Sequence, residues 1–91
     1  MKPVILIPAY RPDKDVLTGL IKEISRLDIR NILVVDDGSG EAFQETFDLV
    51  GRMPGTTVLC HKTNKGKGAA LRTGFRHILS YRIDCSCVVT V

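Results

Sequence analysis

The chain has 91 residues, of which 44% are hydrophobic and 25% are charged, and its formal net charge is +3. This length allows one small domain, and no apolar run approaches the roughly 18–20 residues of a membrane span. The start of the chain has no signal-peptide pattern, and its basic residues gather in one loop instead of a broad stripe with aromatic residues. We therefore expect a cytoplasmic protein that does not bind nucleic acid.

The first third of the chain predicts a strand followed by a helix. Residues 4–7 form a continuous apolar run, typical of a strand that is covered on both faces, and Pro8 should end it. Apolar residues then recur at helical spacing from Val16 to Leu27, with Asp13 or Asp15 as the N-cap.

The middle third predicts a second strand and a second helix. The strand covers residues 32–35 and closes at Asp36-Asp37-Gly38. Ser39 can cap the helix, and Gly51 followed by Pro54-Gly55 should end it. The apolar stripe of this helix holds Phe43, Phe47 and Val50.

The last third predicts a strand, a helix and a final strand. These elements cover residues 57–60, about 66–79, and 87–91. The residues expected to face inward from the helix are Leu71, Phe75 and Ile78. Gly74 lies in the helix interior, where glycine costs about 1 kcal/mol relative to alanine, and this indicates close backbone packing.

Strands and helices alternate along the chain with short links, which predicts an α/β fold with a parallel sheet and right-handed crossovers. The final strand would leave an open edge and an uncovered face. We therefore expect residues 1–91 to be the first part of a larger domain, and to self-associate when alone.

Cys60, Cys85 and Cys87 form no C-x-x-C pair, and no other residues have the spacing of a zinc site. Cys85 and Cys87 are two residues apart on a strand, so both side chains should point to one face. We interpret all three as buried, reduced thiols. His77, on the last helix, is interpreted as a surface residue.

Three polar segments follow the first three predicted strands: residues 8–11, 36–39 and 61–68. In open parallel sheets, ligands bind beyond the C-terminal ends of the strands. These segments should therefore meet at one edge and form a binding site. Tyr10 could stack on a base or cover the end of its strand. Arg11 and Arg72 could contact a diphosphate or lie on the solvated surface.

The pair Asp36-Asp37 is compatible with metal binding, proton relay, helix capping or recognition of a nucleoside. A carboxylate can accept a hydrogen bond from a base N–H or a ribose hydroxyl, and such charge-assisted bonds are strong. Two adjacent carboxylates repel one another, so a purely structural role for both is disfavoured.

The segment Gly66-Lys67-Gly68 has the composition of a phosphate-binding loop. A Walker A motif would need glycine at position 61 and Ser or Thr at position 68, where His61 and Gly68 stand, and G-x-G-x-x-G fails at Leu71. What remains is a glycine-rich helix start beside lysines, which is a general anion site. The alternative is a solvated basic loop.

Taken together, three segments resemble the family 2 glycosyltransferases of GT-A fold over nearly the whole chain. The segments are Ile7-Pro8-Ala9-Tyr10, Val34-Val35-Asp36-Asp37-Gly38-Ser39, and Asn64-x-Gly66-Lys67-Gly68-Ala69-Ala70 with Gly74-Phe75. The last looks most like the branch that moves sugars onto polyprenyl phosphates. The resemblance implies a Rossmann-like, three-layer half-domain with strand order 3-2-1-4, in which residues 1–91 form the N-terminal nucleotide-sugar-binding part.

By this resemblance, the loop after the first strand would flank the uridine. Asp37 would accept the base N–H, Asp36 would support the loop or the ribose, and Lys67 with its flanking glycines would lie near the ribose and phosphate. The implied nucleotide-binding residues are Pro8, Ala9, Tyr10, Asp36, Asp37, Gly66, Lys67 and Gly68. The implied partner is a UDP- or GDP-linked sugar, and a lipid acceptor would bring the enzyme to the cytoplasmic face of the membrane.

The resemblance also implies an Asp-x-Asp motif that holds Mg²⁺ or Mn²⁺ in the whole enzyme, and a later aspartate that acts as general base. Both would follow Val91, so no catalytic or metal-ligating residue is assigned, and these 91 residues alone should show no turnover. Two alternatives stay open. One is a non-catalytic oligomerising module with a vestigial site. The other is a sugar nucleotidyltransferase, which would usually carry a glycine-rich loop where Pro8-Ala9-Tyr10 stands.

Overall fold

The computed structural model describes residues 3–81, 83 and 87–91. Its elements are β1 (Pro3–Ala9), α1 (Lys14–Arg26), β2 (Asn31–Asp37), the short 3-10 helix η1 (Glu41–Phe43), α2 (Gln44–Gly51), β3 (Thr56–His61), α3 (Lys67–Ser80) and β4 (Cys87–Thr90). All neighbouring strands are parallel and the order is β3-β2-β1-β4. The α/β fold and the predicted order 3-2-1-4 are therefore confirmed.

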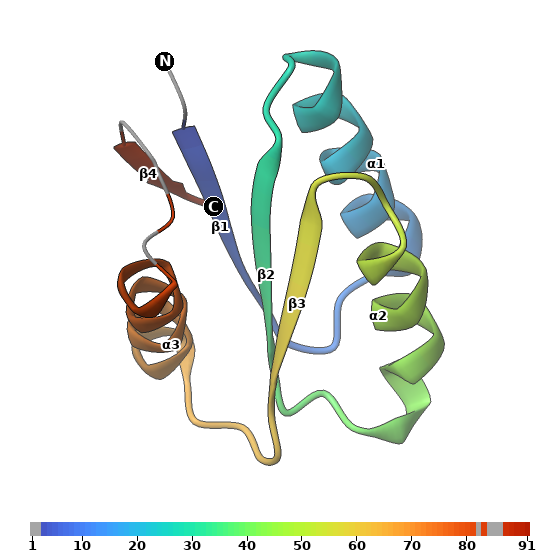
Figure 1. Cartoon of the computed structure of the whole chain (residues 1–91). Coiled ribbons are helices and arrows are strands. Elements are labelled where there is room, and N and C mark those ends of the chain that lie inside the picture. The colour runs from blue at the N-terminus through green and yellow to red at the C-terminus, as the bar shows by residue number, and fades with distance from the viewer. Residues whose placement is uncertain (1–2, 82, 84–86) are drawn as a thin grey trace.

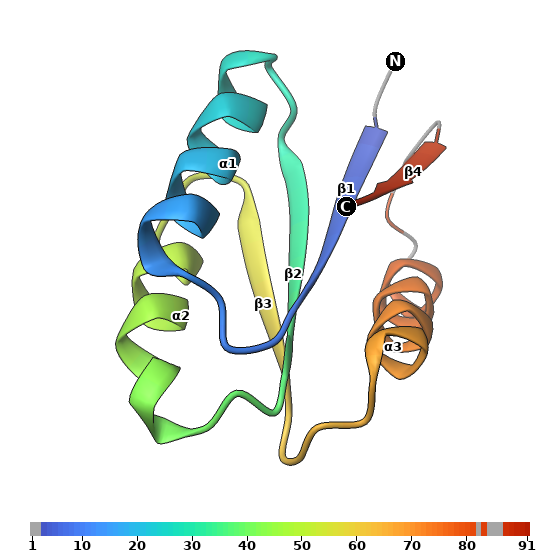
Figure 2. The ribbon, with the colours of Figure 1, turned by 180° about the vertical axis from the view of Figure 1, so that it is seen from behind.

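The domain has three layers, with α1 and α2 on one face of the sheet and α3 on the other (Figures 1 and 2). Side chains alternate along each strand, so every apolar strand supplies both faces. On β1, Ile5 and Ile7 belong to the core under α1 and α2, whereas Val4 and Leu6 belong to the core under α3. The continuous apolar runs of β1 and β2 are thus explained by burial on both sides.

Helix α3 packs against the sheet mainly through small residues. Ala70, Gly74 and Ile78, each four positions apart, are buried, whereas Phe75 is 42% exposed. The prediction that Phe75 faces inward was wrong, because α3 approaches the sheet too closely for a large ring on its inner stripe. The close packing indicated by Gly74 is confirmed, since a Cβ there would collide with the buried side chain of Leu6.

Helix α1 begins at an N-cap that the sequence predicted. The side chain of Asp13 accepts a hydrogen bond from the Val16 backbone N–H at 3.0 Å. Leu17, Ile21 and Ile24 are buried. Val16 and Leu27, the two ends of the predicted apolar pattern, are instead 69% and 71% exposed, because they lie outside the stripe that faces the sheet.

Pro8 does not end β1, which continues through Ala9, and this prediction was wrong. The Val91 N–H donates to the Leu6 carbonyl, so the backbone polar groups of Leu6 face β4. Alternation then points the Pro8 nitrogen to the same side, two positions beyond the last residue of β1 that pairs with β4. The missing N–H of proline therefore costs no hydrogen bond of the ladder.

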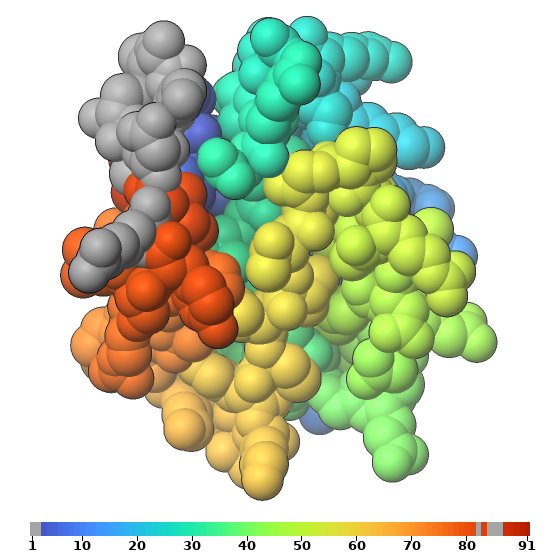
Figure 3. Space-filling view, in the orientation of Figure 1, coloured from blue at the N-terminus to red at the C-terminus, as the bar shows by residue number. Residues whose placement is uncertain are grey.

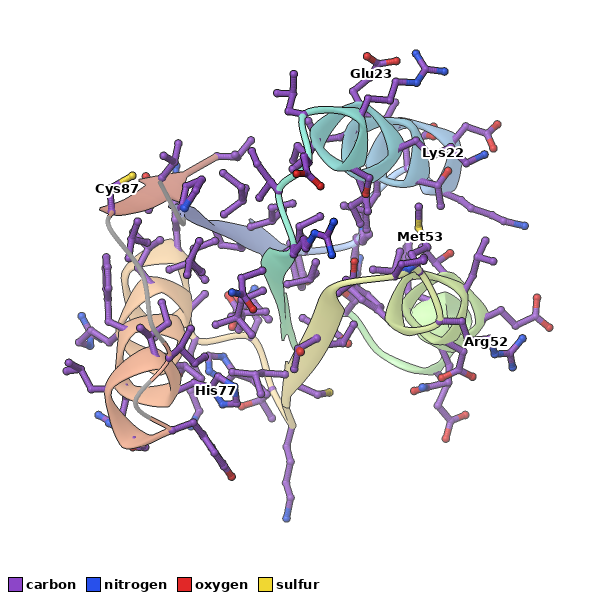
Figure 4. All side chains as sticks on the ribbon, turned by 45° about the horizontal axis from the view of Figure 1, so that its top comes forward. Lys22, Glu23, Arg52, Met53, His77 and Cys87 are labelled. Carbon is purple, nitrogen blue, oxygen red and sulfur yellow. The ribbon has the colours of Figure 1, made fainter. Side chains whose placement is uncertain are left out.

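The cysteines also differ from prediction. Cys60 and Cys87 are exposed, since they lie on the two edge strands, where the helices cover less of the sheet. Figure 4 shows Cys87 at the outer side of the sheet. Cys85 falls outside the described residues. Within the described ranges, no helix combines the length and apolar character needed to cross a membrane.

Candidate functional site

The C-terminal ends of β1, β2 and β3 lie together at the lower edge of the sheet in Figure 1. The segment that joins β3 to α3 forms the surface there (Figure 3). A pocket of about 300 Å³ opens at this edge. Its lining residues are Pro8, Ala9, Tyr10, Asp37, Asn64, Gly66, Lys67 and Val91. We call it the strand-end pocket.

Asp36 and Asp37 are both buried, but they point to opposite faces of β2. Strand alternation places Asp37 on the α3 side together with Leu33 and Val35, and Asp36 on the side of α1 and α2. Only Asp37 lines the strand-end pocket. The two neighbouring carboxylates therefore cannot contact the same bound group, and each has its own set of hydrogen-bond partners.

The carboxylate of Asp37 holds the segment that leads into α3. Its Oδ1 accepts the backbone N–H of Lys65 at 2.9 Å, and its Oδ2 accepts that of Gly66 at 2.8 Å. The Asn64 side-chain amide also donates to Oδ2, at 3.2 Å. His61 Nδ1 lies 2.8 Å from Oδ1. A carboxylate has about four acceptor positions, so protein donors occupy all of them.

These donors decide the ionisation of Asp37. Burial raises its pKa, but the hydrogen bonds from His61, Lys65 and Gly66 lower it, and the net pKa lies below the ordinary value of 3.8. Hydrogen bonds to the charged form of a carboxyl group favour that form. Asp37 is therefore a fixed anion at neutral pH.

His61 links Asp37 to α3. The His61 Nε2 atom lies 2.7 Å from the Thr73 hydroxyl, and its Nδ1 faces Asp37. The side chains of His61 and Asp37 are only 8% and 5% exposed. The ends of β2 and β3 and the first half of α3 are thus joined by a buried polar chain from Asp37 through His61 to Thr73.

Gly38 lets the two loops of the site come together. Its φ of +69° lies in the left-handed region, which favours glycine. A Cβ on Gly38 would collide with the backbone of Thr63 and Asn64. Asp37 therefore supplies the anion that binds the N–H groups of Lys65 and Gly66, and Gly38 leaves the space that the preceding backbone of Thr63 and Asn64 occupies.

Asp36 has a different set of partners, beneath α2. Its Oδ1 accepts the Ser39 backbone N–H at 2.9 Å, and its Oδ2 lies 3.5 Å from the Cys60 thiol. Although Cys60 is partly exposed, burial, then the charge of Asp36 and its hydrogen bond, raise the pKa of the Cys60 thiol above its ordinary 9.0. Asp36 lines a separate pocket between α2 and β3.

Ser39 fixes the loop after β1 instead of capping a helix. Its hydroxyl accepts the Arg11 backbone N–H at 2.8 Å, and η1 and α2 begin with no side-chain cap. The capping prediction for Ser39 was therefore wrong. The Arg11 guanidinium lies 5.3 Å from the centre of the Tyr10 ring, and this ring is 48% exposed at the pocket.

The structure gathers six of the eight predicted site residues in the strand-end pocket, because Asp36 and Gly68 do not line it. The candidate diphosphate residues Arg11 and Arg72 do not line it either. Asn64 and Val91 complete the lining, and sequence reasoning missed them. It also missed the Asp37–His61 contact. One signal could have found it: each residue is the last of its strand, and they pair in the parallel register.

A larger pocket, of about 970 Å³, lies elsewhere, between the C-terminal ends of α1 and α2. Lys22, Arg52 and Met53 are among its lining residues (Figure 4). Cations are favoured near helix C-termini, which accounts for the charge there. This pocket contains none of the predicted site residues, so the strand-end pocket remains the candidate site.

The family model described as "Glycosyl transferase family 2" matches residues 4–83. "Uncharacterized protein MJ1222" of Methanocaldococcus jannaschii is 32% identical over 78 residues, which is 86% of this chain and 30% of that protein. The chain thus spans less than a third of the length of this relative. No solved structure gives a significant match.

Proposed function

The chain belongs to glycosyl transferase family 2, and on this premise we propose that the strand-end pocket binds the nucleoside diphosphate of a sugar donor. One observation carries the proposal. A half-exposed ring, Tyr10, a cation, Lys67, and the start of α3 meet in a pocket at the C-terminal edge of a parallel sheet. Such edges are where open α/β sheets bind ligands.

Each part of the pocket suits one part of a nucleotide. An exposed aromatic ring offers a stacking face to a base. The first N–H groups of α3 have no partner inside the helix, and together with Lys67 they suit a diphosphate. The N–H groups of Lys65 and Gly66 are already bound to Asp37, so the anion site would begin at Lys67.

Recognition of the base by Asp37 stays part of the proposal and takes a definite form. All acceptor positions of the carboxylate are in use, and the Asn64 amide, at 3.2 Å, makes the longest of the four contacts. A base N–H would therefore replace the Asn64 amide on Oδ2. Asp36, on the other face of β2, would support the loop through Ser39.

Family 2 glycosyltransferases often use divalent metals. In the part of the chain that the structure describes, no group of three His, Cys, Asp or Glu side chains could hold one. Asp36 and Asp37 point to opposite faces, so they cannot form half of a site together. The described residues therefore do not fit a metal, and the proposal takes no step through one.

As the reaction that this site serves, we propose transfer of the sugar to an acceptor hydroxyl or phosphate, as in the polyprenyl-phosphate branch. The acceptor oxygen bonds to the anomeric carbon while the bond to the nucleoside diphosphate breaks. A hydroxyl acceptor passes its proton to a base, whereas an ionised phosphate oxygen has no proton to lose. None of the residues described here is assigned to that proton transfer. Their proposed part is to bind and orient the donor.

The test is an NMR titration of the 91-residue chain with UDP and with GDP. Saturable shifts at Tyr10, Gly66 and Lys67 are expected. Lys67→Ala should weaken binding about tenfold, as expected for loss of one charge-assisted contact. Lys62→Ala, which removes an exposed lysine of the same loop that does not line the pocket, should not. No shifts from the folded chain at millimolar nucleotide would contradict the proposal.

A second candidate, self-association, is favoured by β4. Val89, in this edge strand, and Val91, directly after it, are 46% and 50% exposed. Exposed edge strands can pair with another chain. Sedimentation of the chain over a range of concentrations tests this candidate. Val89→Lys should abolish any dimer, and a monomer at all concentrations would exclude it.

A further inference from the structure

We infer that His61 is a positioning residue of the strand-end pocket. Its ring orients the Asp37 carboxylate that holds the backbone N–H groups of Lys65 and Gly66, and it couples this carboxylate to Thr73 on α3. The inference rests on the proposed function, because the backbone held in this way is the wall of the proposed nucleotide site. His61 itself does not line the pocket, so its effect on a ligand would pass through Asp37.

The hydrogen bonds fix the orientation of the ring. An ionised carboxylate can only accept, so His61 Nδ1 must carry a proton and donate to Asp37 across the 2.8 Å contact. In the neutral ring, Nε2 then has a free lone pair and accepts from the Thr73 hydroxyl at 2.7 Å. The structure thus assigns the tautomer with the proton on Nδ1.

The order hydroxyl, imidazole, carboxylate also occurs in the catalytic triads of hydrolases, but the surroundings here exclude that use. Asp37 also accepts hydrogen bonds from the Asn64 amide and from the N–H groups of Lys65 and Gly66, so it holds the loop before α3. The Thr73 hydroxyl is not part of the pocket lining. The chain of contacts therefore serves the loop.

Two substitutions separate the two contacts of His61. An asparagine at this position can place its amide nitrogen near the site of Nδ1 and keep the bond to Asp37. A glutamine can place its amide near the site of Nε2 and keep the contact with Thr73. His61→Asn and His61→Gln are similar in polarity. If His61 acted only by packing, the asparagine variant would therefore not bind nucleotide more tightly than the glutamine variant.

The first measurement is nucleotide affinity, with UDP and GDP as probes. His61→Asn should bind within about twofold of the unmodified chain, and His61→Gln about tenfold more weakly, as expected when a buried anion loses one donor. Equal affinities for the two variants would overturn the inference.

The second measurement needs no nucleotide and separates this inference from the proposed function. Amide hydrogen exchange at Lys65 and Gly66 should be slow in the unmodified chain and in His61→Asn, and faster in His61→Gln. If nucleotides fail to bind but this pattern holds, the proposed function fails and the positioning role stands. Equal exchange in both variants overturns the positioning role.

A third measurement uses the unmodified chain and does not depend on how the variants fold. Nitrogen-15 NMR of the His61 ring should show a proton on Nδ1 at neutral pH. A neutral ring with its proton on Nε2 could not donate to Asp37, and this result would overturn the inference.

Discussion

Leu6 of β1 occupies the space in which a side chain of Gly74 would lie. A Cβ on Gly74 would come within 2.8 Å of Leu6 Cδ2 and closer still to Cδ1, and Leu6 is fully buried. This contact sets the distance between α3 and the sheet. It therefore also sets the position of the first turn of α3, which borders the strand-end pocket.

The first prediction is that Gly74→Ala destabilises the fold. Overpacking a core costs about 1–3 kcal/mol, and the better helix propensity of alanine returns about 1 kcal/mol, so a net loss of about 1 kcal/mol is expected by urea denaturation. Gly19, in the interior of α1, has nothing within 4 Å of its would-be Cβ. Gly19→Ala should stabilise the fold instead, so the same substitution in the interiors of two helices should have opposite signs.

The second prediction concerns pH. The folded-state pKa of Asp37 is lowered, so its contribution to stability is complete above the ordinary value of 3.8 and is lost as the pH falls below it. Asp37→Asn should destabilise the chain by about 2 kcal/mol at pH 7. The difference from the unmodified chain should shrink below about pH 4.

Thermal melts from pH 7 to pH 2.5 measure this difference. Asp48→Asn, which changes an exposed carboxylate on α2, is the control and should leave the pH profile unchanged. A difference for Asp37→Asn that stays constant over the whole range would contradict the lowered pKa.

The third prediction concerns the thiol of Cys60. Because burial and Asp36 raise its pKa, less thiolate is present near pH 8 and alkylation is slow. In a Cys85→Ser/Cys87→Ser background, Asp36→Asn should speed alkylation several-fold by removing the negative charge. Asp48→Asn removes a carboxylate from the same pocket that has no contact with Cys60. If both variants speed the alkylation of Cys60 equally, the contact between Asp36 and the thiol does not matter, and the prediction is contradicted.

The fourth prediction tests the ring of Tyr10. If the ring stacks on the base, Tyr10→Ala should weaken UDP or GDP binding about tenfold, because base stacking on an aromatic side chain contributes about 1–3 kcal/mol. Tyr10→Phe should bind nearly as the unmodified chain does. Tyr81→Ala, which removes a ring that is 72% exposed at the end of α3, is the control. Calorimetric titration gives the affinities. If Tyr81→Ala lowers the nucleotide affinity as much as Tyr10→Ala does, Tyr10 does not stack on the base.

The local sequence pattern predicted an element correctly where residues close in sequence determine it. The apolar runs of β1 and β2 and the Asp13 cap appear in the structure, and so does the strand order 3-2-1-4 that the family resemblance implied. The prediction for Phe75 failed because the inner stripe of α3 is selected by the distance to Leu6 and not by hydrophobicity. The prediction for Ser39 failed because its hydroxyl binds a loop that is distant in sequence.

The sequence by itself determined the family, the alternation of strands and helices, and which polar segments follow the strands. Tertiary structure alone decided which groups Asp36 and Asp37 bind on their opposite faces, and that His61 joins Asp37 to Thr73. The physical reason is that helical periodicity and strand runs depend on near neighbours. The partners of a buried carboxylate depend on the register between strands and on the space that Gly38 and Gly74 leave, and both are set only when the layers pack.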